Sequence, residues 1–245
     1  MNDFLHFQQL DSTNTCLEQL MQSQNRAKAD PLPDGMVVMT GFQTAGRGRK
    51  GNSWFSDNGK NLLMSILIYP NLPVADQFRV TEWISVAMAD TIRQIVGLEA
   101  AVKWPNDIYL GNRKVAGILI SHHWHGSKIG SSIIGIGLNV NQERFPDYLP
   151  TATSLLIGCG RQTDVHDTAL LIREELQRIR QENPERLHRR YLDLLYLRNR
   201  PAQFRDLADG EVFKGVIEGV TPKGLLEMRC NGTLRHYELN GIAYL

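Results

Sequence analysis

A loop rich in arginine and glycine, QTAGRGRKGNSW, occupies residues 43–54. Its three basic residues and three glycines are Arg47, Arg49, Lys50, Gly46, Gly48 and Gly51. An arginine can donate two hydrogen bonds to one phosphate or carboxylate, and glycine lets backbone N–H groups come close to a bound anion. The apolar run at residues 36–40 is typical of a buried strand, so the loop begins where the chain leaves a sheet. These features predict an anion site, and we expect a nucleotide as its ligand.

Two common nucleotide-binding motifs fit this loop poorly. The three glycines match G-x-G-x-x-G, but the following NSWFSDNGKN is rich in turn residues, so no helix is expected there. A Walker A motif needs Lys and then Ser or Thr, where this chain has Arg47 and Gly48. Neither a dinucleotide fold nor a P-loop is therefore expected, and a solvated basic hairpin is the alternative interpretation.

The segment KWPND, residues 103–107, places two polar side chains directly after a proline. Pro105 lacks a backbone N–H group and restricts the residue before it, so it interrupts a strand where Asn106 and Asp107 are presented together. We predict a bulge at a binding site here. The alternative is an edge strand with a surface ion pair between Lys103 and Asp107, worth ~0–1 kcal/mol.

Two glycines interrupt an apolar strand in GIGLNVN, residues 135–141. Glycine inside a strand often marks the close approach of a ligand or of another backbone segment. Asn139 follows the glycines and is suited to hydrogen-bond an adenine edge. Simple strand packing with Asn139 in a turn is the alternative.

The histidines and cysteines do not predict a metal site. His122, His123 and His125 alternate along a strand without a neighbouring carboxylate, so we expect an exposed hairpin end there. The three cysteines are far apart and odd in number, which argues against a disulfide framework and a zinc site.

Hydrophobic periodicity predicts both helices and strands. Helices are expected to begin near Ser12-Thr13-Asn14, to span residues 78–96, to be capped by Asp164, and to begin again after Pro184. Strands are expected at residues 61–69, 101–110, 114–122 and 129–140, with the second and third forming an antiparallel hairpin. Short alternating strands near the C-terminus are typical of a small β-barrel, so we divide the chain into domains 1–200 and 201–245.

Composition narrows the class of protein. The 245-residue chain has a formal net charge of +1, which does not indicate a general nucleic-acid-binding surface. The N-terminal residues lack the features of a signal peptide, and the longest apolar run, residues 62–69, is too short to cross a membrane. We therefore expect a cytoplasmic protein that does not bind membranes.

Five motifs occur together in one order, STN at Ser12, GRGRKG at Gly46, KWPND at Lys103, RKVAGIL at Arg113 and GIGLNVN at Gly135. In this order and spacing the chain resembles the biotin protein ligases over nearly its whole length. The resemblance implies an α+β fold related to class II aminoacyl-tRNA synthetases, with a mixed sheet, flanking helices and a small C-terminal SH3-like β-barrel. It also implies an enzyme that activates biotin with ATP to biotinyl-5′-AMP and transfers the biotinyl group to one lysine of a biotin carboxyl carrier protein.

The same resemblance implies roles for the motif residues. The residues expected to hydrogen-bond the biotin ureido ring are Ser12, Thr13, Asn14 and Gln43. Those expected to cover its carboxylate and the phosphate are Gly46, Arg47, Gly48 and Arg49. The walls around the fused ring would be Gly117, Leu119, Gly135 and Leu138. The expected nucleotide contacts are Arg47, Arg49, Trp54, Asn106, Lys114 and Asn139.

The implied chemistry requires positive charge, because a carboxylate must attack a phosphate and both are anionic. Arg49 and Lys114 are the expected catalytic cations, assisted by Mg²⁺ on the phosphates. In the transfer step we expect Asp107, held by Lys103, to accept a proton from the incoming lysine or to orient it.

Several alternatives follow from the same family. Some biotin protein ligases carry an N-terminal DNA-binding domain, but STN stands at Ser12 here, so DNA binding is not expected. A homodimer formed through the sheet edge is left open. The competing functions are a lipoate or octanoate ligase-like acyltransferase and a non-catalytic biotin-binding module.

Overall fold

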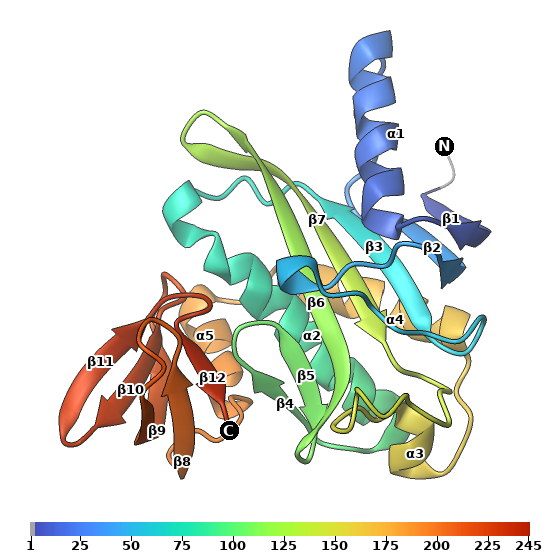
Figure 1. Ribbon diagram of the computed structural model, residues 1–245. Helices are drawn as coiled ribbons and strands as arrows, with labels where there is room; N and C mark the ends of the chain where they lie inside the picture. The colour runs from blue at the N-terminus through green and yellow to red at the C-terminus, as the bar shows by residue number, and fades with distance from the viewer. Residues whose placement is uncertain (1–2) are drawn as a thin grey trace.

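The computed structural model describes residues 3–245 and is built around a mixed seven-stranded sheet with the order β1-β2-β3-β7-β6-β5-β4 (Figure 1). The strands are β1 (Phe4–Leu10), β2 (Met36–Gln43), β3 (Leu62–Ile68), β4 (Ala100–Lys103), β5 (Asp107–Leu110), β6 (Arg113–His125) and β7 (Lys128–Leu138). Strands β1 and β2 are parallel, and the other neighbouring pairs are antiparallel. The predicted mixed α+β fold is therefore confirmed.

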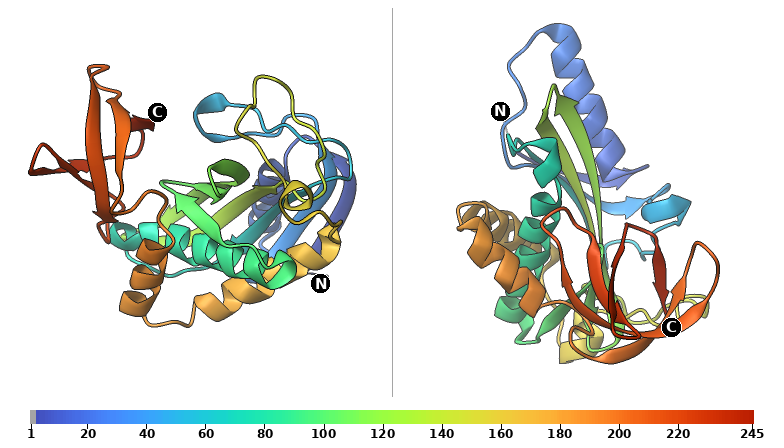
Figure 2. Two further views of the ribbon diagram at one scale, coloured as in Figure 1. Left: turned by 90° about the horizontal axis from the view of Figure 1, so that it is seen from below. Right: turned by 90° about the vertical axis from the view of Figure 1, so that its left-hand side faces the viewer.

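Helices cover both faces of the sheet. They are α1 (Thr13–Ala27), α2 (Phe78–Val96), α3 (Leu155–Cys159), α4 (Val165–Ile179) and α5 (Pro184–Asp193), with short 3₁₀ turns η1 (Arg49–Gly51) and η2 (Val74–Asp76). Val37 and Met39 pack into the main core with α2 and α4, whereas Met36 and Val38 pack with Leu17 of α1. Because side chains alternate along a strand, α1 lies on the face opposite α2 and α4 (Figure 2). All seven residues of β3 are buried, because helices cover both faces of the sheet at this strand.

The predicted helix bounds agree well with the structure where capping or periodicity is strong. Helix α2 spans the predicted residues 78–96, and the Asp164 side chain accepts a hydrogen bond from Asp167 N at 2.8 Å at the start of α4. Ser12 occupies the N-cap position of α1, but within residues 3–245 its side chain makes no capping hydrogen bond. That hydroxyl is thus not used to begin the helix.

The KWPND segment corrects one prediction. In place of a single bulged strand, the chain reverses at Trp104-Pro105-Asn106, and β4 and β5 pair antiparallel with Lys103 opposite Asp107. The Trp104–Pro105 peptide bond is cis. The reversal turns Asn106 and Asp107 toward β6, where Asn106 Nδ2 donates to Ile118 O at 2.9 Å.

The C-terminal part is a five-stranded antiparallel sheet with the order β11-β10-β9-β8-β12. Its strands are β8 (Pro201–Asp206), β9 (Val212–Val220), β10 (Leu226–Cys230), β11 (Thr233–Tyr237) and β12 (Ile242–Tyr244). Strands β11 and β12 form its two edges. Beside the main sheet it stands as a separate layer (Figure 2), yet Phe204 and Ile217 belong to the same hydrophobic cluster as Tyr191 of α5.

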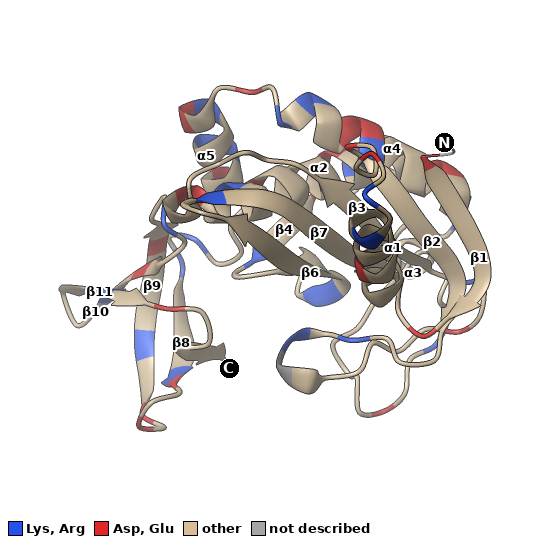
Figure 3. Cartoon of the chain, turned by 90° about the horizontal axis from the view of Figure 1, so that it is seen from above, with Lys and Arg blue, Asp and Glu red and all other residues tan. Residues whose placement is uncertain are grey.

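Charged residues of both signs are distributed along the chain, and α4 and α5 carry both colours in Figure 3. Arg178 of α4 and Arg190 of α5 form ion pairs with Asp90 of α2 and with Glu182, and these pairs connect the three helices. In residues 3–245 no helix has the length and apolar character needed to cross a membrane.

Candidate active site

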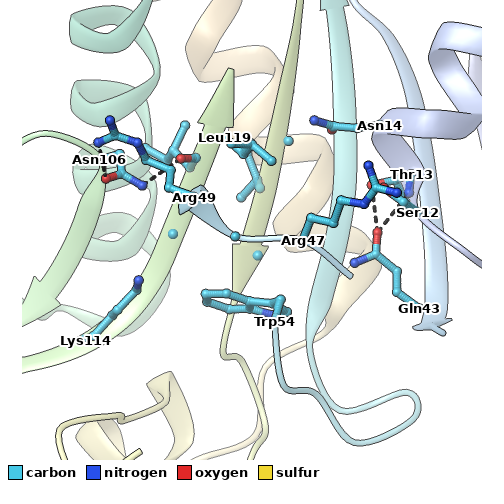
Figure 4. Close-up of a pocket in the computed structure, with 16 residues that line it drawn as sticks. Ser12, Thr13, Asn14, Gln43, Arg47, Arg49, Trp54, Asn106, Lys114 and Leu119 are labelled. Atoms are coloured by element: carbon cyan, nitrogen blue, oxygen red, sulfur yellow. Dashed lines mark hydrogen bonds between the residues drawn. The ribbon is translucent and has the colours of Figure 1, made fainter. Parts of the chain in front are cut away.

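A cavity lies between the start of α1, the η1 loop and strands β6 and β7 (Figure 4). Its lining residues are Ser12, Thr13, Asn14, Gln43, Arg47, Gly48, Arg49, Trp54, Asn106, Lys114, Gly117, Ile118, Leu119, Gly135, Ile136 and Gly137. Residues from all five sequence motifs therefore meet in one place, although they are spread over more than half of the chain. The anion loop, the STN segment and the glycine strand form one site.

One end of the cavity is a hydrogen-bonded polar cluster. Gln43 Oε1 accepts from Thr13 N at 2.8 Å and from Thr13 Oγ1 at 3.2 Å. Behind it, Ser65 Oγ lies 2.7 Å from Thr13 Oγ1 and 2.5 Å from Asn14 Oδ1. The amides and hydroxyls are thus pre-oriented, as a site for a small polar ring requires.

The middle of the cavity is a floor of glycines covered by Trp54. A Cβ atom at Gly137 would collide with the Trp54 ring, and one at Gly117 would lie 3.0 Å from Trp54 Cζ3. A Cβ atom at Gly135 would collide with Asn14. These positions need glycine because aromatic and amide groups pack directly on the strand backbone.

The other end of the cavity carries two cations. Lys114 Nζ lies 2.7 Å from Asp107 Oδ1 and 5.7 Å from the centre of the Trp54 ring. Arg49 Nη1 donates to Asn106 Oδ1 at 3.1 Å, as the dashed line in Figure 4 marks. Burial lowers the pKa of the Arg49 guanidinium, whose ordinary value is so high that the group stays charged at neutral pH. Two cations therefore face the cavity, one of them paired with Asp107, and together they can offset part of the negative charge of a carboxylate and a phosphate.

The predicted partnership of Asp107 with Lys103 is wrong. Lys103 Nζ donates to the Tyr109 hydroxyl at 2.9 Å and lies over the rings of Tyr109 and Tyr244, at 4.9 and 4.6 Å from their centres. Burial lowers the pKa of Lys103. Residues that face each other on paired strands need not have side chains in contact. Here Lys103 lies over the aromatic rings, and Asp107 forms its ion pair with Lys114.

A second cavity adjoins the first through Trp54 and Lys114. Its lining residues are Asn52, Ser53, Trp54, Phe55, Lys114, Asn139, Phe145, Tyr148, Leu149 and Ala152. Asn139 Nδ2 donates to Thr153 O at 2.9 Å, whereas its buried Oδ1 has no hydrogen-bond partner among the described residues. Aromatic walls with a free amide oxygen suit a planar base that carries an N–H donor.

Comparison with known proteins decides the family. Residues 6–139 match the model of the biotin/lipoate A/B protein ligase family. The bifunctional ligase/repressor BirA of Escherichia coli is 30% identical over 238 residues, which cover 93% of this chain and 73% of that protein. The chain belongs to the biotin/lipoate A/B protein ligase family.

Two further comparisons place this family member. BirA of Bacillus subtilis is 38% identical over 135 residues, which span 54% of this chain and 42% of that relative. The biotin protein ligase from Aquifex aeolicus, solved with biotin and ATP, has the same fold, with a TM-score of 0.75, 21% identity and coverage of 99% of this chain and 98% of that one.

Some predicted site residues of this biotin/lipoate ligase family member lie outside the first cavity. Leu138 is fully buried in the main core, because it alternates with Gly137 on β7. Gly46, Lys103 and Asp107 do not line the cavity, and Asn139 lines the second one. The Lys50 side chain lies outside the described parts of the structure.

Sequence reasoning also missed residues that the site uses. Ser65 had one signal, because it is the single polar residue of the otherwise apolar strand LLMSILI. Phe145, Tyr148 and Leu149 come from a loop without periodicity, so no pattern pointed to them.

Proposed function

We propose that the protein is an ATP-dependent biotin protein ligase. It would activate biotin to biotinyl-5′-AMP and transfer the biotinyl group to one lysine of a biotin carboxyl carrier protein or carrier domain. The observation that carries this proposal is the continuity of the site. A polar cluster, a glycine floor and a pair of cations form one cavity, which shares Trp54 and Lys114 with an aromatic-walled second cavity.

Biotin fits the first cavity by its chemistry. Its ureido group both donates and accepts hydrogen bonds, and Ser12, Thr13, Asn14 and Gln43 offer both kinds of partner. The apolar fused ring would lie between the polar cluster and Trp54, beside Leu119. Its carboxylate would then point toward Arg47, Arg49 and Lys114, which line the same cavity.

ATP fits the second cavity. The adenine would lie among Phe145, Tyr148 and Trp54 and donate an N–H to the unpaired Asn139 Oδ1. Its α-phosphate would then reach Lys114 at the junction of the two cavities. Mg²⁺ is proposed to be held by the ATP phosphates, because the carboxylate beside the cations, Asp107, is already paired with Lys114. When bound there, it would neutralise phosphate charge.

In the first step a biotin carboxylate oxygen attacks the α-phosphorus, a P–O bond forms, and the bond to pyrophosphate breaks. Arg49 and Lys114 offset the negative charge that the two reactants bring together. In the second step the lysine nitrogen attacks the carbonyl carbon of the mixed anhydride, and AMP leaves. The attacking amine must be neutral, which at pH 7.4 costs about 4 kcal/mol for a lysine of ordinary pKa. We propose that Asp107 accepts the proton from that amine or orients the amine for attack.

We also propose a boundary between two domains near Pro201, where β8 begins, and an SH3-like character for the five-stranded C-terminal sheet. Its short antiparallel strands support that assignment.

A cytoplasmic location agrees with the three free thiols, Cys16, Cys159 and Cys230.

Biotin-dependent pyrophosphate release from Mg-ATP tests the proposed first step. We expect release with biotin and none without it. Equal or greater release with lipoate or octanoate would instead assign the protein to the lipoate branch of the family. Tight biotin binding without any release would identify a binding module.

A further inference from the structure

A side chain of the C-terminal sheet forms a hydrogen bond with the anion loop. Asn240, in the turn between β11 and β12, accepts a hydrogen bond at Oδ1 from Arg49 Nη2 at 3.4 Å. The two residues are separated by 191 positions in the sequence. The other hydrogen-bond partner that the described chain gives the Arg49 guanidinium is Asn106 Oδ1 at 3.1 Å. Arg49 is thus held between an amide of the main sheet and an amide of the C-terminal sheet.

The hydrogen-bond partners of Arg49 are neutral amides, whereas several other arginines of this protein form ion pairs. Carboxylates bind Arg173, Arg178, Arg180, Arg190 and Arg229. The acidic group whose charge acts on Arg49 is Asp107, and that carboxylate is itself paired with Lys114. An amide oxygen orients a guanidinium without neutralising it, so the charge of Arg49 stays available to an anionic ligand.

The C-terminal sheet is fixed firmly enough to position a side chain. Trp104 Nε1, in the turn between β4 and β5, donates to Gly224 O at 3.1 Å in a buried contact. A Cβ atom at Gly224 would lie 2.6 Å from Phe78 Cδ2, so α2 packs directly on this turn of the sheet. The Tyr244 ring covers Lys103. These three contacts anchor the C-terminal sheet to α2 and to the β4–β5 hairpin.

We propose that Asn240 is a positioning residue that holds Arg49 in the orientation needed for adenylate formation. This rests on the proposed ligase function. The C-terminal sheet thereby takes part in the first chemical step through one hydrogen bond, although its residues do not line the first cavity.

Asn240→Gly tests the proposal without backbone strain, because Asn240 has a φ of 76°, a left-handed value that glycine adopts freely. Asn231→Gly is the matched control, since Asn231 is also left-handed, with a φ of 49°, and lies in the turn between β10 and β11. We expect Asn240→Gly to lower kcat/KM for ATP in pyrophosphate release about threefold to tenfold, as for one lost hydrogen bond of ordinary net strength, because this bond is long and exposed. Asn231→Gly should stay at the wild-type value.

Two more variants separate positioning from general stability. Asn240→Asp places a carboxylate against Arg49 that competes with the bound anion, so its loss should exceed that of Asn240→Gly. In an Arg49→Ala background, Asn240→Gly should have no further effect. An equal loss in that background, or wild-type kcat/KM for Asn240→Gly, would overturn the proposal.

A measurement without turnover distinguishes this inference from the ligase function itself. We expect ¹⁵N relaxation of the Arg49 guanidinium to show greater mobility in Asn240→Gly and no change in Asn231→Gly. Wild-type protein that releases no pyrophosphate would refute the proposed function and, with it, the catalytic meaning of Asn240. Unchanged Arg49 mobility would refute the positioning role alone.

Discussion

Lys114 lies, with Trp54, where the two cavities meet, and its positive charge is the property that the proposed adenylation step requires. Its Nζ contacts Asp107 and faces the Trp54 ring. We expect Lys114→Ala to reduce biotin-dependent pyrophosphate release on the order of 10²–10³-fold, because a preorganised charge at the reacting phosphate is lost. Lys60→Ala, which removes a surface partner of Glu143, is the control and should keep full activity. A Lys114→Ala variant as active as the control would contradict the assignment.

Asp107 can be tested separately from Lys114 because the two reaction steps make different demands on it. Asp107→Asn keeps the shape of the side chain but removes its ability to take a proton. Transfer from preformed biotinyl-5′-AMP to the carrier lysine should then slow by about tenfold or more, while pyrophosphate release changes little. Single-turnover transfer and steady-state pyrophosphate release measure the two steps. Equal loss of both would instead assign Asp107 to holding Lys114.

At the scale of elements, the start of α1 is fixed to β3 by one buried hydroxyl. Ser65 Oγ contacts both Thr13 Oγ1 and Asn14 Oδ1. We expect Ser65→Ala to raise KM for biotin about threefold to tenfold, because Thr13 and Asn14 each lose one hydrogen-bond partner, with a smaller effect on KM for ATP. Ser85→Ala is a matched control, since Ser85 is equally buried and its hydroxyl has no hydrogen-bond partner among residues 3–245. Equal KM values for biotin in the two variants would refute the role of Ser65.

Elements with a strong local signal could be predicted from the sequence. The helical period fixes α2, and the Asp164 and Pro184 signals fix the starts of α4 and α5. The reversal at Pro105 was missed because β4 and β5 have four residues each, too few for a period to separate them from one interrupted strand. The resemblance implies Leu138 as a wall of the ring site, but alternation along β7 places it on the face opposite Gly135 and Gly137.

For the whole molecule, one added methyl group at Gly224 should disturb the packing of the C-terminal sheet on α2. Gly224 has a φ of 89° and packs against Phe78. Gly224→Ala should lower the free energy of unfolding by roughly 1–3 kcal/mol, through both strain and the clash with Phe78. Gly210→Ala, at a φ of 81° with open space around it, carries the strain alone and should cost less. Denaturant unfolding of both variants measures the difference, and equal losses would show that the added methyl group at Gly224 does not clash with Phe78.

Contacts between distant parts of the chain were beyond sequence reasoning. Most residues of the first cavity belong to the sequence motifs. Each motif can be recognised locally, and the family resemblance implies that the motifs share one site. The second cavity depends on Phe145 and Tyr148, which a loop brings against Trp54, and the link from Arg49 to Asn240 joins two sheets. Neither follows from a period or a motif, because both are set by how the finished elements pack.

Mass spectrometry of a biotin carboxyl carrier domain after incubation with this protein, biotin and Mg-ATP tests the proposed ligase activity. We expect a mass gain of one biotinyl group, which is absent without ATP and when lipoate replaces biotin. A gain with lipoate and none with biotin, or no gain with either acid, would contradict it.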